Sequence, residues 1–173
     1  MRIPLALAAA GAALLIAGCG GSVSVGDTTK TLDQADVGFT FDYPDSFSVK
    51  KVDVANTQGK VRALVGLDDN NLIAVRQFAT REANSPAMLK ASTVSFATQN
   101  GVPASAVSLR TRSGIDMATF KTATTVDGTN TANEEWVFPI GGATWQLECQ
   151  STPDQGDAVR KACDMALDSI KAK

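Results

Sequence analysis

The chain has 173 residues, with 16 basic and 18 acidic side chains and a formal net charge of −2 at pH 7. It has no Lys/Arg cluster, so the electrostatic signature of a nucleic-acid-binding protein is missing. It contains no histidine, which excludes Ser-His-Asp and Cys-His catalysis and the usual general base near neutral pH. We therefore expect a non-enzymatic protein with no metal and no cofactor. An enzyme that relied on carboxylates alone would need two acidic groups converging in one cleft.

The N-terminal stretch is predicted to be a secretory signal peptide over residues 1–18. Arg2 is the only charged residue before Cys19, and residues 3–16 are almost wholly Ala, Leu, Ile and Gly. A positive start, an apolar run and the small pair Ala17-Gly18 are typical of such a leader. The run is shorter than the roughly 20 apolar residues of a transmembrane helix.

The stretch Ile16-Ala17-Gly18-Cys19 resembles the lipobox of bacterial lipoproteins. That resemblance implies cleavage before Cys19, attachment of a diacylglycerol to its thiol, and acylation (palmitate) of the new amine. Two or more acyl chains make a lasting membrane anchor, because each buried CH₂ contributes about 0.8 kcal/mol. The implied location is the extracytoplasmic face of the cell membrane. An ordinary secreted protein with an incidental leader cysteine is the alternative.

Residues 19–36 are rich in Gly, Ser and Thr and predict a flexible tether. A single folded domain is expected over residues 37–173. Its first residues alternate between apolar and polar side chains without a break, which predicts a strand with one apolar face. Further strands are predicted at about 47–54, 61–67 and 72–79, and the last is apolar at successive positions, so both of its faces should be covered. The residues of the first apolar face are Val37, Phe39, Phe41 and Tyr43.

The middle of the domain is predicted to be a helix followed by more strands. Ser85 and Pro86 fit the N-cap and the first helical position, and Gly101 is a plausible end. Strands are expected over 107–112 and 115–126. The next strand has Trp136, Phe138 and Ile140 on one face, and the tight turn Gly141-Gly142 follows it.

Two cysteines lie in the last strand and the last helix. The alternation of the strand puts Cys149 on its apolar face with Trp145 and Leu147, and the helical period puts Cys163 on the apolar side of a helix that starts with a capping box at Thr152. An even pair in an oxidising compartment predicts a disulfide. The bridge would hold this helix against the inner face of the sheet.

The order of elements predicts an α+β domain, with a curved, mainly antiparallel sheet packed against two or so helices. Residues 38–47, GFTFDYPDSF, resemble the opening strand of PsbP/Mog1-like α/β/α sandwich proteins. Bacterial (actinobacterial) lipoproteins of the LpqN type have a similar strand. This resemblance implies a protein-binding or assembly factor rather than an enzyme.

Three residue pairs are candidate sites. Trp136 and Trp145 flank the Gly141-Gly142 turn and could line a ligand pocket, with core packing as the ordinary alternative. Arg110 and Arg112 share a polar strand face, which is either an exposed sheet face or a grip for an anion. The neighbours at positions 134 and 135 are both Glu and should point to opposite faces, one into solvent and one at a rim.

Two functions follow as hypotheses. In the first, the domain is a non-enzymatic, membrane-anchored module that binds another protein of the cell envelope. In the second, it carries a lipid or another apolar molecule, which requires an unfilled apolar cavity.

Overall fold

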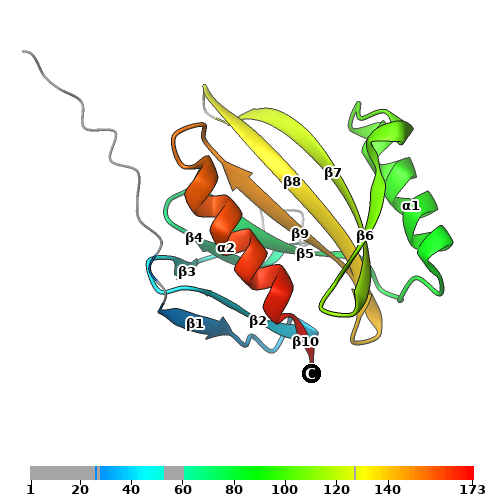
Figure 1. Cartoon of the computed structure of the whole chain (residues 1–173), viewed down its shortest axis with the longest axis horizontal. Helices are drawn as coiled ribbons and strands as arrows, with labels where there is room; N and C mark the ends of the chain where they lie inside the picture. The colour runs from blue at the N-terminus through cyan, green and yellow to red at the C-terminus, as the bar shows by residue number, and fades with distance from the viewer. Residues whose placement is uncertain (1–25, 27, 53–60, 127) are drawn as a thin grey trace, which may run out of the picture.

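The computed structural model describes residues 26, 28–52, 61–126 and 128–173. The leader, Cys19 and the end of the strand predicted at about 47–54 lie outside these ranges. The fold is α+β, as the sequence predicts, and it contains two antiparallel sheets and two α-helices (Figure 1). No described helix is long and apolar enough to cross a membrane.

The larger sheet has seven strands in the order β3-β4-β5-β9-β8-β7-β6. Its strands, in chain order, are β3 (Ser48–Lys50), β4 (Val61–Gly66), β5 (Leu72–Ala79), β6 (Ser108–Arg112), β7 (Ile115–Val126), β8 (Thr129–Ile140) and β9 (Ala143–Ser151). The smaller sheet has the order β1-β2-β10, with β1 (Thr29–Leu32), β2 (Phe39–Pro44) and β10 (Lys171–Ala172).

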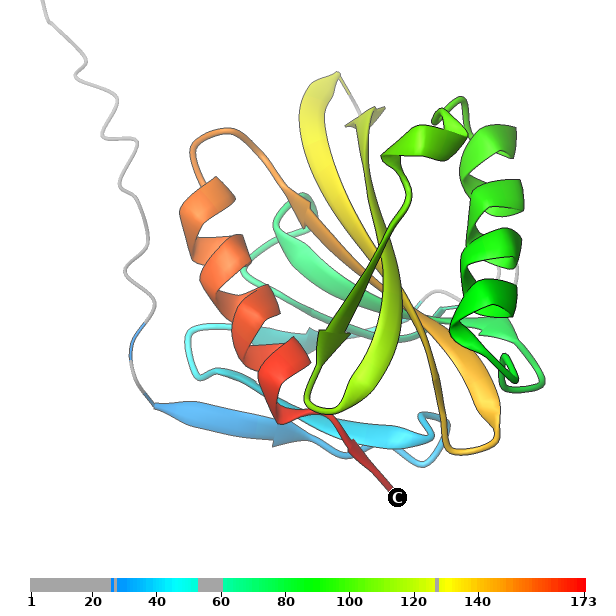
Figure 2. The same cartoon turned by 45° about the vertical axis from the view of Figure 1, so that its right-hand side comes forward.

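The two helices cover opposite faces of the larger sheet (Figure 2). Helix α2 (Gly156–Ser169) packs against β9, β5 and β2, whereas α1 (Pro86–Gln99) packs against β7, β8 and β6. A short 3₁₀ helix, η1 (Ala104–Ala106), follows α1. Successive side chains of β8 point to opposite faces of the sheet. Phe138 belongs to the core under α2, and Val137 belongs to the core under α1.

Aromatic residues fill the core between the larger sheet, β2 and α2. The ring of Phe39 on β2 meets the ring of Phe138 edge-on at 5.3 Å between centroids, and that of Trp145 at 5.6 Å. The alternation predicted for the opening strand is confirmed, since Val37, Phe39, Phe41 and Tyr43 are all buried. This interior is built for packing and belongs to the fold rather than to a ligand.

Helix α1 begins where the sequence predicts. Ser85 is its N-cap, and the Ser85 hydroxyl accepts a hydrogen bond from the Met88 amide at 3.2 Å. Pro86 occupies the first helical position, where its missing N–H costs nothing. Beyond the helix, Gly101 has a φ of +77°, which favours glycine at this end.

The N-terminal boundary of the domain is corrected by the structure. Strand β1 lies within the stretch predicted as tether, and it pairs with β2 from Thr29 opposite Pro44 to Leu32 opposite Phe41. Leu32 is buried, while the three residues before it are exposed. An edge strand with one buried side chain has no apolar periodicity to find, so composition alone assigned it to the tether.

The start of α2 also differs from the prediction. The helix begins at Gly156 after the N-cap Gln155, and no side chain caps it. The predicted capping box at Thr152 is wrong because this residue bonds elsewhere. Its amide and hydroxyl both donate to Oδ1 of Asn71, at 2.8 and 2.9 Å. Thr152 therefore ties the end of β9 to the turn before β5.

Candidate functional site

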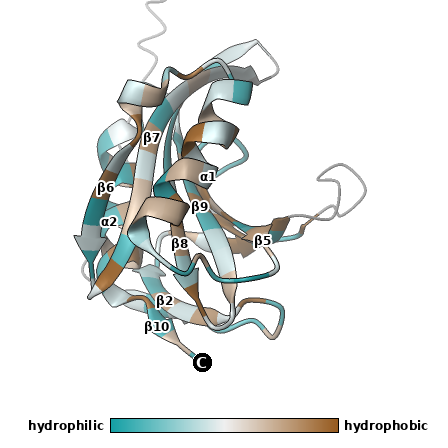
Figure 3. Ribbon diagram, turned by 90° about the vertical axis from the view of Figure 1, so that its right-hand side faces the viewer, coloured by the Kyte–Doolittle hydropathy of each residue, from teal (hydrophilic) through white to brown (hydrophobic). Residues whose placement is uncertain are grey.

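A polar pocket of about 330 Å³ lies on the α1 side of the larger sheet. Figure 3 views the molecule from this side, with α1 in front of the sheet. Helix α1 packs over β7 and β8, and beside it strands β8, β9 and β5 present polar side chains on the same face. The side chains that define this polar pocket are Arg76, Phe96, Asn133, Glu135, Gln146 and Glu148.

Two glutamates meet in the polar pocket. Glu135 on β8 stands directly opposite Glu148 on β9, and both are buried, with 5% and 8% of their surface exposed. Two nitrogens of Arg76, Nε and Nη2, donate to the same Glu148 oxygen, Oε2, at 2.9 and 2.7 Å. Gln146 Nε2 donates to Oε2 of Glu135 at 2.7 Å. Each carboxyl thus has one oxygen held by a neighbouring side chain.

Glu135 holds its proton near neutral pH. Burial, together with the negative charge of Glu148, raises the pKa of Glu135 to about 8, although the Gln146 hydrogen bond and the charge of Arg76 act in the opposite direction. Desolvation dominates because a buried carboxylate loses its hydration. The two glutamates and Arg76 together therefore carry almost no net charge at pH 7.

Asn133 adds an unsatisfied acceptor to the polar pocket. Its side chain is 5% exposed, and its Nδ2 donates to the Thr124 hydroxyl at a long 3.4 Å. Its Oδ1 is buried and has no hydrogen-bond partner in the part of the chain that the structure describes. Buried polar atoms in native proteins nearly always form hydrogen bonds. This oxygen is therefore a free acceptor for a hydrogen bond from a group outside the described residues.

The structure overturns the prediction that one of the two glutamates faces solvent and the other lies at a rim. The two neighbours do point to opposite faces, as predicted, and Glu134 lies half-buried on the α2 side. Glu135, however, is buried on the α1 side, because both faces of this sheet are covered. The sequence held a signal for this pocket in Arg76, which follows the four apolar residues that open β5, and in Gln146 and Glu148, which alternate with apolar residues along β9.

The predicted tryptophan pocket is also corrected. Trp145 is a core residue, with its indole N–H donating to the Ile140 carbonyl at 3.2 Å. Strand β2 closes over it at Gly38, where an added Cβ would lie 3.3 Å from the indole ring. Trp136 belongs to the same buried core, and it also lines a groove of about 750 Å³ between β6–β8 and α2. The structure therefore favours core packing for both rings, and the two do not form a pocket between them.

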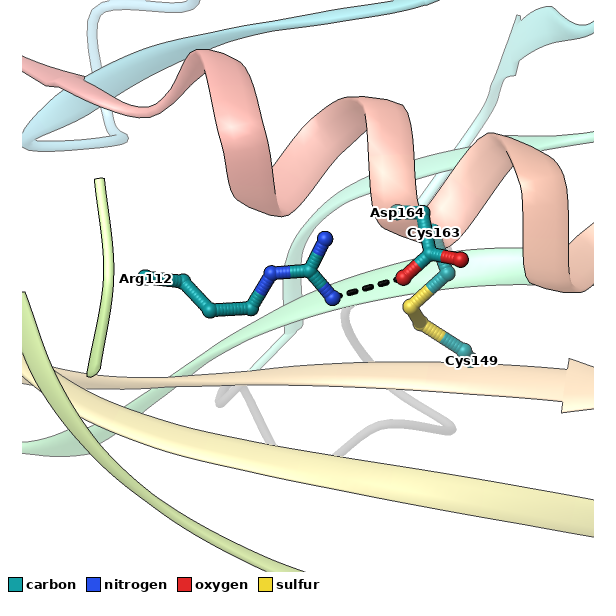
Figure 4. Close-up of a disulfide and its surroundings, with 4 residues drawn as sticks. All are labelled: Arg112, Cys149, Cys163 and Asp164. Atoms are coloured by element: carbon teal, nitrogen blue, oxygen red, sulfur yellow. Dashed lines mark hydrogen bonds and ion pairs between the residues drawn. A yellow bond between two sulfur atoms is a disulfide. The ribbon is translucent and has the colours of Figure 1, made fainter. Parts of the chain in front are cut away.

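The predicted anion-binding face of β6 is largely occupied by the protein itself. Arg112 forms an ion pair with Asp164 on α2 at 2.6 Å (Figure 4). It also pairs with Asp168 on the same helix at 2.8 Å and lies 5.8 Å from the centroid of the Trp136 ring. Arg110 is exposed in the same groove. Arg112 thus fastens the sheet edge to α2 and does not offer a free guanidinium to a ligand.

A disulfide joins Cys149 on β9 to Cys163 on α2, with 6.1 Å between their Cα atoms (Figure 4). This is the pairing that the strand and helix patterns predict, and both residues are buried in the larger core. The bridge crosses the same layer as the Arg112 ion pairs. Helix α2 is therefore held to the sheet covalently at β9 and by charge at β6.

Replacing both Cys149 and Cys163 by Ala should lower the free energy of unfolding by about 3 kcal/mol, as the chain-entropy account gives for a loop of this length. Urea denaturation, read by fluorescence of the two tryptophans, measures the loss. A reducing agent should destabilise the wild-type protein by a similar amount and leave the double variant unchanged. Equal stability of the variant and the oxidised wild type would show that the bridge contributes nothing.

No group of three or more potential metal-binding side chains occurs within the described residues. The pair of glutamates in the polar pocket has Arg76 as its third charged neighbour, and two carboxyl groups alone are too few ligands to hold a metal ion. The arrangement suits hydrogen bonding with an organic ligand.

Fold and pocket together define an α+β domain with a polar binding pocket on one sheet face. No family model matches the chain, and no curated protein matches it. Among solved structures, a Bacteroides thetaiotaomicron crystal structure is similar at a TM-score of 0.59 and 13% identity. The match covers 83% of this chain and 48% of that one, so the chain spans about half of its length. This likeness shows the fold alone.

Two further structures are similar at lower TM-scores. Cyanobacterial PsbP from Synechocystis matches at 0.43 and 12% identity, over 91% of this chain and 99% of that one. LpqN of Mycobacterium tuberculosis, described as involved in cell envelope biogenesis, matches at 0.46 and 15% identity, over 83% and 90%. Likenesses this distant carry no argument about function.

Proposed function

We propose that the protein is a non-enzymatic binding module of the cell envelope, held at the extracytoplasmic face of the membrane by lipid on Cys19. Its binding site would be the polar pocket beside α1, and its partner another envelope protein. The lipobox-like stretch at residues 16–19 supports the location. The Cys149–Cys163 disulfide supports an oxidising compartment.

One observation carries the proposed site: the polar pocket buries Asn133 Oδ1, and none of the residues that the structure describes donates a hydrogen bond to it. Burying a polar atom without a hydrogen bond costs free energy. A sheet face used only for packing would be apolar, as it is beneath Leu89 and Val137 in the same layer. A ligand that donates a hydrogen bond would offset this cost, which is a physical reason for the pocket to bind one.

Binding a polar partner fits the pocket better than either alternative. An apolar carrier needs an unfilled apolar cavity, whereas aromatic rings fill the space under α2. The polar pocket does have apolar walls, including Phe96 and Phe120, but buried carboxyl, amide and guanidinium groups lie among them. The two carboxyls do converge, as the sequence required of a carboxylate enzyme. Two N–H groups of Arg76 bind Glu148, however, which engages the carboxylate that would have to act as the base or nucleophile, and we assign the pair to binding.

The anchor is tested on the protein extracted from membranes of its native host. Mass spectrometry of its N-terminal peptide should find a chain that begins at Cys19 and carries acyl groups. A chain that retains residues 1–18 and has an unmodified thiol would refute the anchor.

The site is tested by photo-crosslinking in intact cells. A photoreactive amino acid replaces Ala123, which is exposed and lines the polar pocket, and in a control it replaces Lys90, which is exposed on α1 away from the pocket lining. We expect a specific adduct from position 123 that position 90 does not give, and its loss when Asn133→Ala is added. The same adduct pattern from both positions would refute the pocket as the binding site.

A further inference from the structure

We infer that the polar pocket binds a primary ammonium group, with Asn133, Glu135 and Glu148 as its hydrogen-bond acceptors. This inference rests on the proposed function, because it names the ligand class of the same site. The shared chemistry, an alkyl chain that ends in –NH₃⁺, occurs in free amines and in the lysine side chain of a protein partner.

The hydrogen bonds already made in the polar pocket leave acceptors over. Arg76 directs two N–H groups at Glu148, and Gln146 directs one at Glu135. All three bonds end on the Oε2 atom of the glutamate concerned, and Asn133 Oδ1 accepts none from the described residues. An ammonium group has three donors and no acceptor, so it complements a site of this kind better than a hydroxyl does, which would bring acceptors of its own.

Once Glu135 is ionised, the charges of the polar pocket favour a cation. The charged and titratable groups that face Glu135 are Glu148 from β9 and Arg76 from β5. Helix α1 contributes Phe96, with Asn100 just after it, and β7 contributes Thr122 and Thr124; all four are uncharged. The pocket thus holds two carboxyl groups and one guanidinium. A bound cation would neutralise the carboxylate that the guanidinium does not.

Aromatic side chains provide the apolar part of the site. Phe96 and Phe120 both line the polar pocket, with ring centroids 6.1 Å apart. Their rings can cover the alkyl chain of the ligand, and a cation near an aromatic face gains further attraction. A volume of about 330 Å³ has room for one such chain and its head group.

Binding should exchange a proton for the ligand. Glu135 is protonated at neutral pH in the free protein. When R–NH₃⁺ binds, the carboxyl of Glu135 ionises and releases one H⁺ to solvent. The charge of the ligand replaces the proton, and the pKa of Glu135, raised by burial and by Glu148 in the free protein, should fall in the complex. Below pH 8 the affinity should then rise about tenfold per pH unit.

The inference is tested by calorimetric titration of the full-length chain in detergent micelles with pentylammonium. At pH 7, titrations in phosphate and in MOPS buffer should reveal release of close to one proton, and the affinity should increase about tenfold from pH 6 to pH 7. Pentanol and tetramethylammonium, which lack the charge or the donors, should bind at least tenfold more weakly. Glu135→Gln should abolish the proton release, and Glu134→Gln, the neighbour on the opposite face, should leave it unchanged.

A short peptide with one lysine, and its Nε-acetylated form, distinguish the sources of the amine. Tighter binding of the lysine peptide than of pentylammonium points to a protein partner, and the reverse points to a free amine. Equal binding of pentylammonium and pentanol, or binding of pentylammonium without proton release, would overturn the inference. Crosslinks at position 123 with no ammonium binding would leave the proposed function intact, whereas loss of both results would remove it as well.

Discussion

Between pH 5 and pH 8, Glu135 alone is expected to lower the free energy of unfolding by about 1.4 kcal/mol per pH unit. Its pKa is about 8 in the folded protein, against an ordinary value of 4.5. Within this window the folded chain holds a proton that the unfolded chain has released, so stability falls as the pH rises. The contribution is fully present below about pH 4.5 and is lost as the pH passes 8.

Urea denaturation across this pH range, compared between the wild-type protein and Glu135→Gln, measures the effect. The variant keeps a neutral side chain of similar shape, so its advantage over the wild type should grow steadily with pH. Glu134→Gln serves as the matched control and should follow the wild-type profile. Parallel profiles for the wild type and Glu135→Gln would mean that the buried carboxyl does not hold its proton.

Replacing Phe138 by Ala should lower the free energy of unfolding by about 3–5 kcal/mol. The side chain is fully buried, and its ring meets that of Phe39 edge-on at 5.3 Å. The change removes apolar contacts and leaves a cavity that β2 and β8, fixed by their hydrogen bonds, can only partly close. Urea denaturation gives the loss as a shift in the midpoint.

Val49→Ala is the control for this core substitution, since Val49 is 45% exposed on β3. It should change the free energy of unfolding by less than about 0.5 kcal/mol. A Phe138→Ala variant that loses no more than this control would show that β2 and the larger sheet are not packed against each other as described.

The elements that the sequence predicts well are those with a strong local pattern. The alternation of apolar and polar residues predicts β2, β8 and β9. The Ser85-Pro86 pair predicts the start of α1. Strands β1 and β10 were not predicted because neither has an apolar pattern of its own. Each is defined by its hydrogen-bonded pairing with β2. Thr152 is similar, because its apparent role as a cap is overridden by Asn71, which is 81 residues away.

The candidate site was harder to predict than the fold for the same reason. Each carboxyl of the pair looks like a surface residue within its own strand. Only the register of β8 against β9 puts Glu135 opposite Glu148, and only the position of α1 buries both. The tryptophans show the reverse case, because the local pattern on two adjacent strands is enough to place both Trp136 and Trp145 in the core.

The pairing of β2 has a consequence for the order in which the chain can fold. One of its neighbours, β1, lies just before it, but its other neighbour, β10, and the helix that covers its aromatic face, α2, come from the last eighteen residues of the chain. Strand β2 can therefore complete its packing only when residues 156–173 are in place. Contacts of such long range slow folding.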